Sequence, residues 1–99
     1  MGSRKVTVKR SAAESIAAIA WYIESKGMVA TANKFADAVY DFFYTLADDR
    51  KSFATCRDDS RALLGYKCVN YKKRYTVVFI ETETSLIIVE FVSSKMIHW

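Results

Sequence analysis

The stretch YTVVFI at residues 75–80, together with LIIV at 86–89, decides the fold class of this chain. Nearly every position in both runs is β-branched, aromatic or leucine, which is typical of strands in the middle of a sheet. Two short polar segments, 72–74 and 83–85, separate these runs from each other and from a third candidate strand. Such short connections predict an antiparallel meander. The predicted strands are 66–71, 75–82 and 86–93.

Upstream, the periodicity changes from that of a strand to that of a helix. Residues 4–10 alternate between apolar and polar side chains, which predicts a half-buried strand. Ser11 followed three residues later by Glu14 matches the capping box, in which each side chain bonds a free backbone N–H at the start of a helix. A helix is therefore predicted at about 12–26, ending at Gly27.

A second apolar stripe with helical spacing predicts a longer helix at about 30–48. Only a few residues separate the two helices, so we expect an antiparallel hairpin that covers one face of the sheet. Residues 50–65 have no clear period and are expected to be irregular. With 99 residues there is room for one core only, and the expected fold is a single α+β domain of order β-α-α-β-β-β over 1–99.

Charge is distributed unevenly along the chain, although the net charge is only +4. Residues 1–10 and 50–99 each carry +4, whereas 11–49 carry −4. No apolar run approaches the roughly 18 residues of a membrane span, and charged residues interrupt any signal-peptide pattern near the start. We therefore expect a cytoplasmic protein that makes no membrane contact.

The chain has two cysteines, Cys56 and Cys68, which are twelve positions apart and lack the C-x-x-C spacing. One histidine, His98, cannot complete an ordinary four-ligand zinc site with them. The prediction is two free thiols, no metal and no cofactor.

The element order and several segments resemble the RelE/ParE superfamily of type II toxin–antitoxin toxins. The likeness covers nearly the whole chain and rests on hydrophobic patterns. Its most telling segments are IESKG at 23–27, ANKF at 32–35, GY at 65–66, YTVVF at 75–79 and IIVEF at 87–91. The resemblance implies a small antitoxin protein as partner. It also implies one of two activities, because ParE-like members inhibit DNA gyrase and RelE-like members cleave mRNA on the ribosome.

The residues expected of a RelE-like nuclease are incomplete. Such enzymes need cations and an acid–base pair around the scissile phosphate, and relatives supply them from the sheet and from a C-terminal aromatic or His-aromatic pair. This chain ends in His98-Trp99, but Thr76 stands where relatives commonly carry arginine. If the chain is a nuclease, its candidate catalytic residues are Lys73, Arg74 and His98.

The densest basic cluster lies around the predicted turn at 72–74 and is interleaved with tyrosines. That composition suits a surface that holds phosphates and stacks on bases. An equally ordinary interpretation is a solvated turn whose lysines protect a sheet edge from pairing. The candidate residues for contact with nucleic acid or another target are Lys67, Tyr71, Lys72, Lys73 and Arg74.

Trp21 and Tyr22 fall outside the apolar stripe of the first helix, since each residue turns the helix by about 100°. Exposed aromatic side chains on an amphipathic helix are frequent anchors for partners, so both are candidates for antitoxin contact. The alternative is that Trp21 packs over the second helix near Tyr40 or Tyr44.

The sequence thus favours a ParE-like toxin that inhibits an essential machine by binding, with gyrase as the target implied by resemblance. The first alternative is a RelE-like, ribosome-dependent mRNA endoribonuclease. The second is an inactive relative that only binds its antitoxin and takes part in operon repression.

Overall fold

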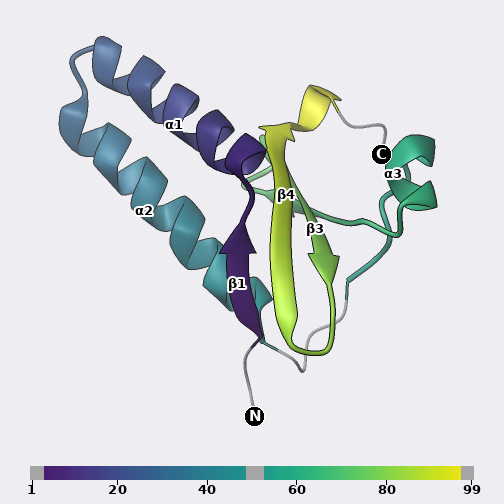
Figure 1. The fold of residues 1–99 in the computed structure, drawn as a ribbon. Coiled ribbons are helices and arrows are strands. Elements are labelled where there is room, and N and C mark those ends of the chain that lie inside the picture. The colour runs from purple at the N-terminus through teal and green to yellow at the C-terminus, as the bar shows by residue number, and fades with distance from the viewer. Residues whose placement is uncertain (1–3, 49–52, 97–99) are drawn as a thin grey trace.

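The computed structural model describes residues 4–48 and 53–96 of the chain. Its strands and helices follow the predicted β-α-α-β-β-β order, with one short helix added in the segment expected to be irregular (Figure 1). Each predicted helix or strand is present, with ends shifted by one or a few residues. The elements are β1 (Lys5–Val8), α1 (Arg10–Ser25), α2 (Val29–Leu46), α3 (Asp59–Leu63), β2 (Lys67–Tyr71), β3 (Tyr75–Glu81), β4 (Ser85–Ser93) and the 3-10 turn η1 (Ser94–Met96).

The four strands form one mixed sheet in the order β1-β4-β3-β2. β2, β3 and β4 make the predicted antiparallel meander, and the two most apolar strands, β3 and β4, are central as expected. β1 pairs in parallel with β4, from Lys5 opposite Ser85 to Val8 opposite Ile88. The sheet is therefore not wholly antiparallel.

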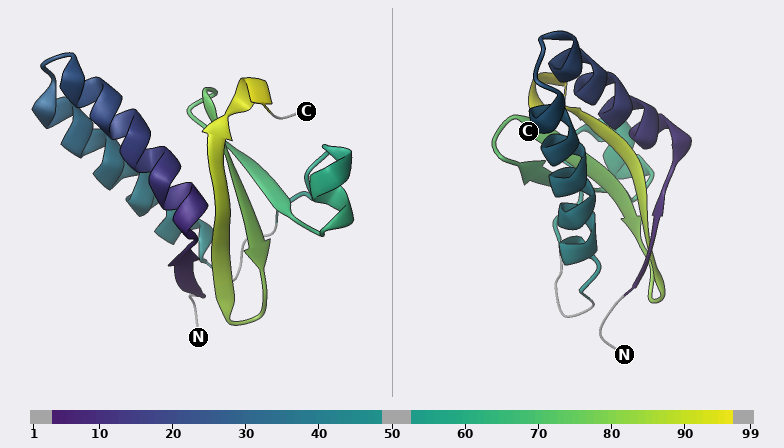
Figure 2. Two further views of the ribbon diagram at one scale, coloured as in Figure 1. Left: turned by 45° about the horizontal axis from the view of Figure 1, so that its top comes forward. Right: turned by 90° about the vertical axis from the view of Figure 1, so that its left-hand side faces the viewer.

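The α1–α2 hairpin lies on one face of the sheet, and its tip extends beyond the sheet edge (Figures 1 and 2). Apolar side chains of both helices are buried against those of the central strands. Burial of this kind supplies most of the stability of a small domain, at about 25 cal/mol per Å² of apolar surface. The largest fully buried members of this core are Ile16, Val39, Phe43, Val77, Phe79, Leu86, Ile88 and Phe91.

A β-bulge in β4 sets which side chains of that strand face the helices. Val78 pairs with Glu90 whereas Phe79 pairs with Ile88, so Val89 is the extra residue. Because of it, Ile88 and Phe91, three positions apart, are both buried in the same core. Glu90 is left to point to the opposite face of the sheet.

Ser11 stabilises this bulge and does not cap α1. Its hydroxyl donates a 2.8 Å hydrogen bond to the backbone carbonyl of Val89, and the residue that precedes α1 is Lys9, without a side-chain cap. The predicted capping box is therefore wrong, because the helix begins one residue before Ser11. At the other end Gly27 follows the helix with a positive φ of 81°, as the sequence predicts.

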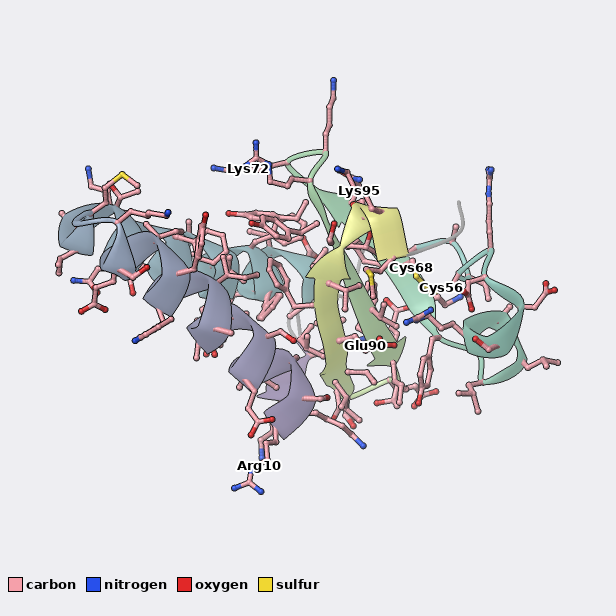
Figure 3. All side chains as sticks on the ribbon, turned by 90° about the horizontal axis from the view of Figure 1, so that it is seen from above. Arg10, Cys56, Cys68, Lys72, Glu90 and Lys95 are labelled. Atoms are coloured by element: carbon pink, nitrogen blue, oxygen red, sulfur yellow. A yellow bond between two sulfur atoms is a disulfide. The ribbon has the colours of Figure 1, made fainter. Side chains whose placement is uncertain are left out.

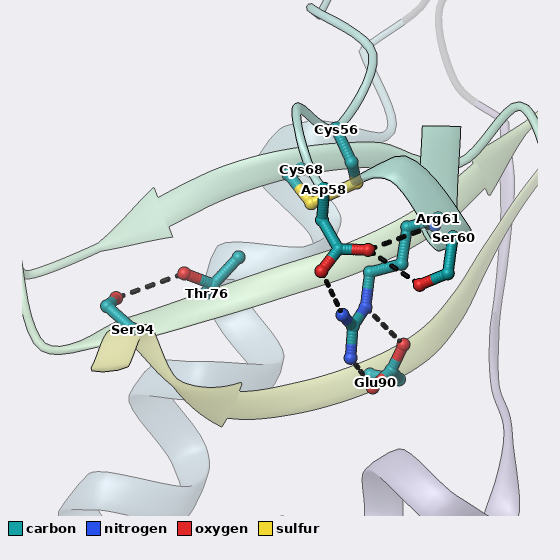
Figure 4. Close-up of a disulfide and its surroundings, with 8 residues drawn as sticks. All are labelled: Cys56, Asp58, Ser60, Arg61, Cys68, Thr76, Glu90 and Ser94. Carbon is teal, nitrogen blue, oxygen red and sulfur yellow. Dashed lines mark hydrogen bonds and ion pairs between the residues drawn. A yellow bond between two sulfur atoms is a disulfide. The ribbon is translucent and has the colours of Figure 1, made fainter. Parts of the chain in front are cut away.

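Cys56 and Cys68 form a disulfide, so the prediction of free thiols is wrong (Figure 4). The segment before α3 runs back along β2, with an antiparallel bridge between Thr55 and Lys67 and a 2.9 Å bond from the Cys56 N–H to the Tyr66 carbonyl. This pairing brings the two cysteine Cα atoms to 4.8 Å, within the usual range for a disulfide. A spacing of twelve in the sequence carries no sign of that pairing.

Over the described residues, neither of the two long helices combines the length and the hydrophobicity that crossing a bilayer requires, and α3 is far too short.

Candidate functional site

The β2–β3 turn holds three consecutive exposed cations, Lys72, Lys73 and Arg74. A 3.2 Å hydrogen bond from the Arg74 N–H to the Tyr71 carbonyl closes the turn. Both central residues are left-handed, with φ of 53° at Lys72 and 60° at Lys73. Two left-handed central residues define a type I′ turn, the type that matches the twist of a hairpin and usually contains Asn-Gly.

Two lysines at these positions are energetically unfavourable, because the left-handed conformation costs an L-residue with a Cβ about 1 kcal/mol or more. The turn offsets part of this cost locally. Asn70 accepts a 2.6 Å hydrogen bond from the Lys73 N–H, and the Lys72 ammonium lies 5.6 Å from the centre of the Tyr71 ring. Unfavourable backbone conformations of this kind are found most often at functional sites.

Further cations reach the turn from other parts of the chain. Lys95 lies in η1, directly after β4, and the Ser94 N–H bonds the Arg74 carbonyl at 2.9 Å. Figure 3 shows Lys72 and Lys95 at the same end of the molecule and Arg10 on the opposite side. We call the five residues Lys34, Lys72, Lys73, Arg74 and Lys95 the basic end. Within the described residues, none of the five forms an ion pair with a carboxylate.

Compared with the cations of the predicted cluster, the basic end gains Lys34 and Lys95 and loses Lys67. Lys67 is at the other end of β2, opposite Phe79 and bridged to Thr55, and so lies a strand's length from the turn. The sequence analysis does not include Lys95, although the predicted meander could have indicated it. Because Tyr75 pairs with Ser93, the residues after β4 must lie beside the β2–β3 turn. Lys34 was missed because nothing in the sequence shows which part of α2 faces this end.

Of the tyrosines near the turn, Tyr71 is packed into the core, and Tyr75 is half-buried. Tyr71 is 7% exposed, with its ring 4.8 Å from that of Phe42, and burial raises its pKa above the usual 10.0. Tyr75 stacks on Phe91 at 4.9 Å. Stacking on a nucleobase would require a free face. The structure therefore gives Tyr71 a packing role beside the cations.

The candidate nuclease residues are only partly brought together. Lys73 and Arg74 are adjacent and exposed at the turn, whereas His98 and Trp99 lie outside the described residues. Thr76, at the position where the resemblance implies arginine, is fully buried, and its hydroxyl lies 3.0 Å from that of Ser94. Since this hydroxyl has its partner inside the protein, Thr76 is not placed to contact a phosphate.

Two surface cavities flank the basic turn. One, of about 550 Å³, lies between the turn and the end of β4, and Lys73, Ser93 and Lys95 are among its lining residues. The other, of about 480 Å³, lies on the opposite side of the turn, between it and the helical hairpin. The cations thus stand between two hollows that a partner could enter.

A second exposed surface lies near the tip of the hairpin. The side chains of Trp21 and Tyr22 are 70% and 59% exposed, and Met28 and Val29 extend the apolar patch across the turn between the helices. The Lys26 ammonium lies 5.1 Å from the centre of the Tyr22 ring. Packing of Trp21 over α2, the alternative from the sequence, does not agree with so much exposure.

On the face of the sheet opposite the helices, an ion-pair network joins α3 to β4 (Figure 4). Arg61 of α3 contacts both Glu90 and Asp58, and the contact with Glu90 raises the arginine's pKa. A 2.7 Å bond from the Ser60 hydroxyl and a 3.1 Å bond from the Arg61 N–H lower the pKa of Asp58 below its usual 3.8. Arg61 therefore pairs with Asp58, three residues before it, and with Glu90 of β4, which is distant in the sequence.

Over residues 4–48 and 53–96, no three histidine, cysteine, aspartate or glutamate side chains come close enough together to hold a metal ion. No protein-family model matches the chain, and no curated protein matches it significantly in sequence. The features that bear on function are therefore the fold and the two exposed surfaces.

Proposed function

We propose that this chain is the toxin of a type II toxin–antitoxin pair and acts, in the ParE-like way, by binding an essential machine. The observation that carries the proposal is the basic end: five exposed cations without ion pairs to the described carboxylates, grouped around a turn in an unfavourable conformation. Binding sites retain such costs in stability when the residues serve a partner. The toxin class comes from the likeness of the fold to the RelE/ParE layout, which is an argument by analogy.

Binding is favoured over RNA cleavage because of what surrounds Lys73 and Arg74. A 2′-hydroxyl needs a base to take its proton, and the leaving oxygen needs an acid. Besides these two cations, the described residues that line the cavity of about 550 Å³ are Tyr75, Ser93, Ser94 and Lys95. The hydroxyl of Thr76 is paired with that of Ser94. Cations with hydroxyl groups suit a contact with a negatively charged surface. DNA gyrase is the target that the family resemblance implies.

The antitoxin partner is assigned to the tip of the hairpin. Trp21 and Tyr22 are exposed aromatic side chains on a rigid helix, the type of residue that dominates binding energy in protein interfaces. Trp21→Ala is expected to weaken the antitoxin complex by about 2 kcal/mol or more, which isothermal titration calorimetry would measure. Thermal unfolding should not change, because the side chain has few contacts to lose. An unchanged affinity would show that Trp21 is not part of the antitoxin interface.

The deciding experiment is pulse-labelling of a bacterial host after tightly controlled induction, following thymidine and amino-acid incorporation over the first minutes. An early fall in DNA synthesis supports the gyrase proposal, and a supercoiling assay with purified gyrase then tests it directly. In that assay Lys73→Glu/Arg74→Glu should lose inhibition, whereas Lys9→Glu/Arg10→Glu, with the same change in charge on the opposite side, should retain it.

The runner-up is a ribosome-dependent mRNA endoribonuclease that uses Lys73, Arg74 and His98. An early fall in protein synthesis would favour it. In that case Arg74→Ala and His98→Ala should each abolish toxicity without lowering thermal stability. Toxicity that survives both substitutions would eliminate the nuclease.

A third possibility is an inactive relative that binds only its antitoxin and helps to repress their operon. It predicts that neither DNA synthesis nor protein synthesis falls after induction.

We also propose that the protein works in the cytoplasm. A disulfide such as Cys56–Cys68 is uncommon there, since cytoplasmic thiols are usually kept reduced. Alkylation of thiols in intact cells, followed by mass spectrometry, would show whether the two cysteines are bonded where the protein acts.

A further inference from the structure

The cavity of about 480 Å³ between the helical hairpin and the basic turn is lined by three residues of the basic end, but the function proposed above assigns it no occupant. Its size lies within the range of about 300–1,000 Å³ that is usual for ligand pockets. α2 forms one wall, the β2–β3 turn forms the opposite wall, and Ile23 near the end of α1 closes one side. Two rigid elements and a closed turn therefore shape it, which favours a preformed site.

Every charged residue that lines this cavity is a cation. Lys34 belongs to the α2 wall, and Lys72 and Arg74 belong to the turn, so positive charge faces the cavity from both sides. None of the three is paired with a carboxylate within the described part of the chain. An occupant with negative charge at two separated points would be complementary to this arrangement.

The remaining lining is largely apolar. Ile23, Phe35 and Ala38 contribute hydrocarbon surface, and Tyr71 and Tyr75 contribute aromatic surface. A purely ionic ligand would leave this surface in contact with water. The occupant should therefore carry a large apolar group between its charges, because burying one such group gains about as much as several exposed ion pairs.

The aromatic rings decide between a nucleobase and an amino-acid side chain as that apolar group. Tyr75 stacks on Phe91 at 4.9 Å, and Phe35 meets Tyr75 edge to face at 5.8 Å. The ring of Tyr71 is covered by Phe42 on one side and approached by the Lys72 ammonium. Base recognition depends on open ring faces, whereas an aliphatic or phenyl side chain packs against ring edges.

We propose that this cavity binds a peptide segment of a partner protein in which one large apolar side chain is flanked by carboxylates. The apolar side chain fills the hollow beside Phe35 and Ala38, and the carboxylates on its two sides meet Lys34 and the cations of the turn. The proposal is independent of whether the protein is a toxin, because it depends only on the lining of this cavity.

The test uses fluorescence anisotropy with a labelled heptapeptide, a phenylalanine between two runs of three glutamates. A matched peptide with glycine at the centre should bind about tenfold more weakly, since it lacks the apolar group. Lys34→Glu should weaken binding of the phenylalanine peptide about fivefold. Lys95→Glu, the same change of charge at the basic end but outside this cavity, should change it less than about twofold. Ala38→Leu, which fills the cavity, should abolish the preference for phenylalanine over glycine.

Three results would overturn the proposal. Equal affinity for the phenylalanine and glycine peptides would show that no apolar pocket is used. Equal weakening by Lys34→Glu and Lys95→Glu would show attraction by net charge alone. Tighter binding of a labelled oligothymidylate, with displacement of the peptide, would make this a nucleic-acid surface. Amide chemical shifts of the unmodified protein give a check that needs no variant, because the phenylalanine peptide should move the signals of Thr31 and Ala38 and leave that of Arg10 unchanged.

Discussion

Arg61 of α3 and Glu90 of β4 form a bidentate ion pair, with 2.7 Å between Nη2 and Oε1 and 2.8 Å between Nε and Oε2. Both side chains are largely shielded, at 19% and 27% exposure. The planar guanidinium matches a carboxylate in this geometry, which is stronger than a single contact. This pair fixes the short helix over the sheet face that carries the disulfide.

Replacing Arg61 by alanine is expected to lower the free energy of unfolding by about 1.5 kcal/mol, because Glu90 and Asp58 then lose a charged hydrogen-bond donor. Urea denaturation followed by circular dichroism would measure the loss. The matched control is Arg10→Ala. The Arg10–Glu14 pair is 91% and 71% exposed, and pairs of this kind contribute less than about 0.5 kcal/mol. Equal effects of the two substitutions would refute a special role for Arg61.

The disulfide gives the second prediction. Cys56 and Cys68 close a loop with a sequence separation of 12, and a crosslink over about that length stabilises a fold by about 3 kcal/mol, chiefly by restricting the unfolded chain. Reduction with dithiothreitol should therefore lower the free energy of unfolding by that amount and shift the urea midpoint to a lower concentration. Cys56→Ala/Cys68→Ala should match the reduced protein and no longer respond to reductant. Native protein that takes up two alkyl groups from iodoacetamide without prior reduction would contradict the bond.

The third prediction concerns the turn. Lys72→Asn/Lys73→Gly installs the residue pair that a type I′ turn prefers and should raise the free energy of unfolding by about 1 kcal/mol. The same variant should bind the proposed target more weakly, since it loses two cations. Lys72→Ala/Lys73→Ala separates the two effects: it removes the charges but keeps side chains with a Cβ at both positions, so it should weaken binding without the gain in stability. A less stable Asn-Gly variant would show that the lysine side chains stabilise the turn.

The helices and strands could be predicted from the periodicity of the sequence. Contacts between residues far apart in the sequence could not be predicted. The alternating and helical patterns located the hairpin and the central strands β3 and β4, because burial on one face imposes a period on the chain. The sequence favours a helix cap at Ser11, because a serine three residues before a glutamate suits that role. Only the structure shows that its hydroxyl instead bonds the Val89 carbonyl at the bulge in β4. The disulfide depends on a segment folding back along β2, for which spacing gives no signal.

The candidate site was predictable to a similar extent. The turn cations are consecutive in the sequence and were found, whereas Lys34 and Lys95 come from α2 and from the end of β4. Tyr71 illustrates the limit of composition as an argument. A tyrosine beside lysines suggests base stacking, yet the strand alternation turns this ring toward Phe42 and Phe91 in the core.

The fourth prediction follows from the burial of Tyr71, which raises its pKa above 10.0. The folded protein then holds this proton at a pH where the unfolded chain has lost it, so the resulting stability is fully present below pH 10 and declines as the pH rises through the folded value. The decline approaches about 1.4 kcal/mol per pH unit for one proton.

Urea denaturation at intervals from pH 9 to 11 should show a steeper loss of stability for the unmodified protein than for Tyr71→Phe, which has no phenolic proton to lose. Tyr22→Phe is the matched control, because it removes the same hydroxyl group from a side chain that is 59% exposed. Parallel curves for Tyr71→Phe and the unmodified protein would mean that water reaches the Tyr71 hydroxyl. The cavity that Tyr71 lines would then be hydrated on that side and less rigidly packed.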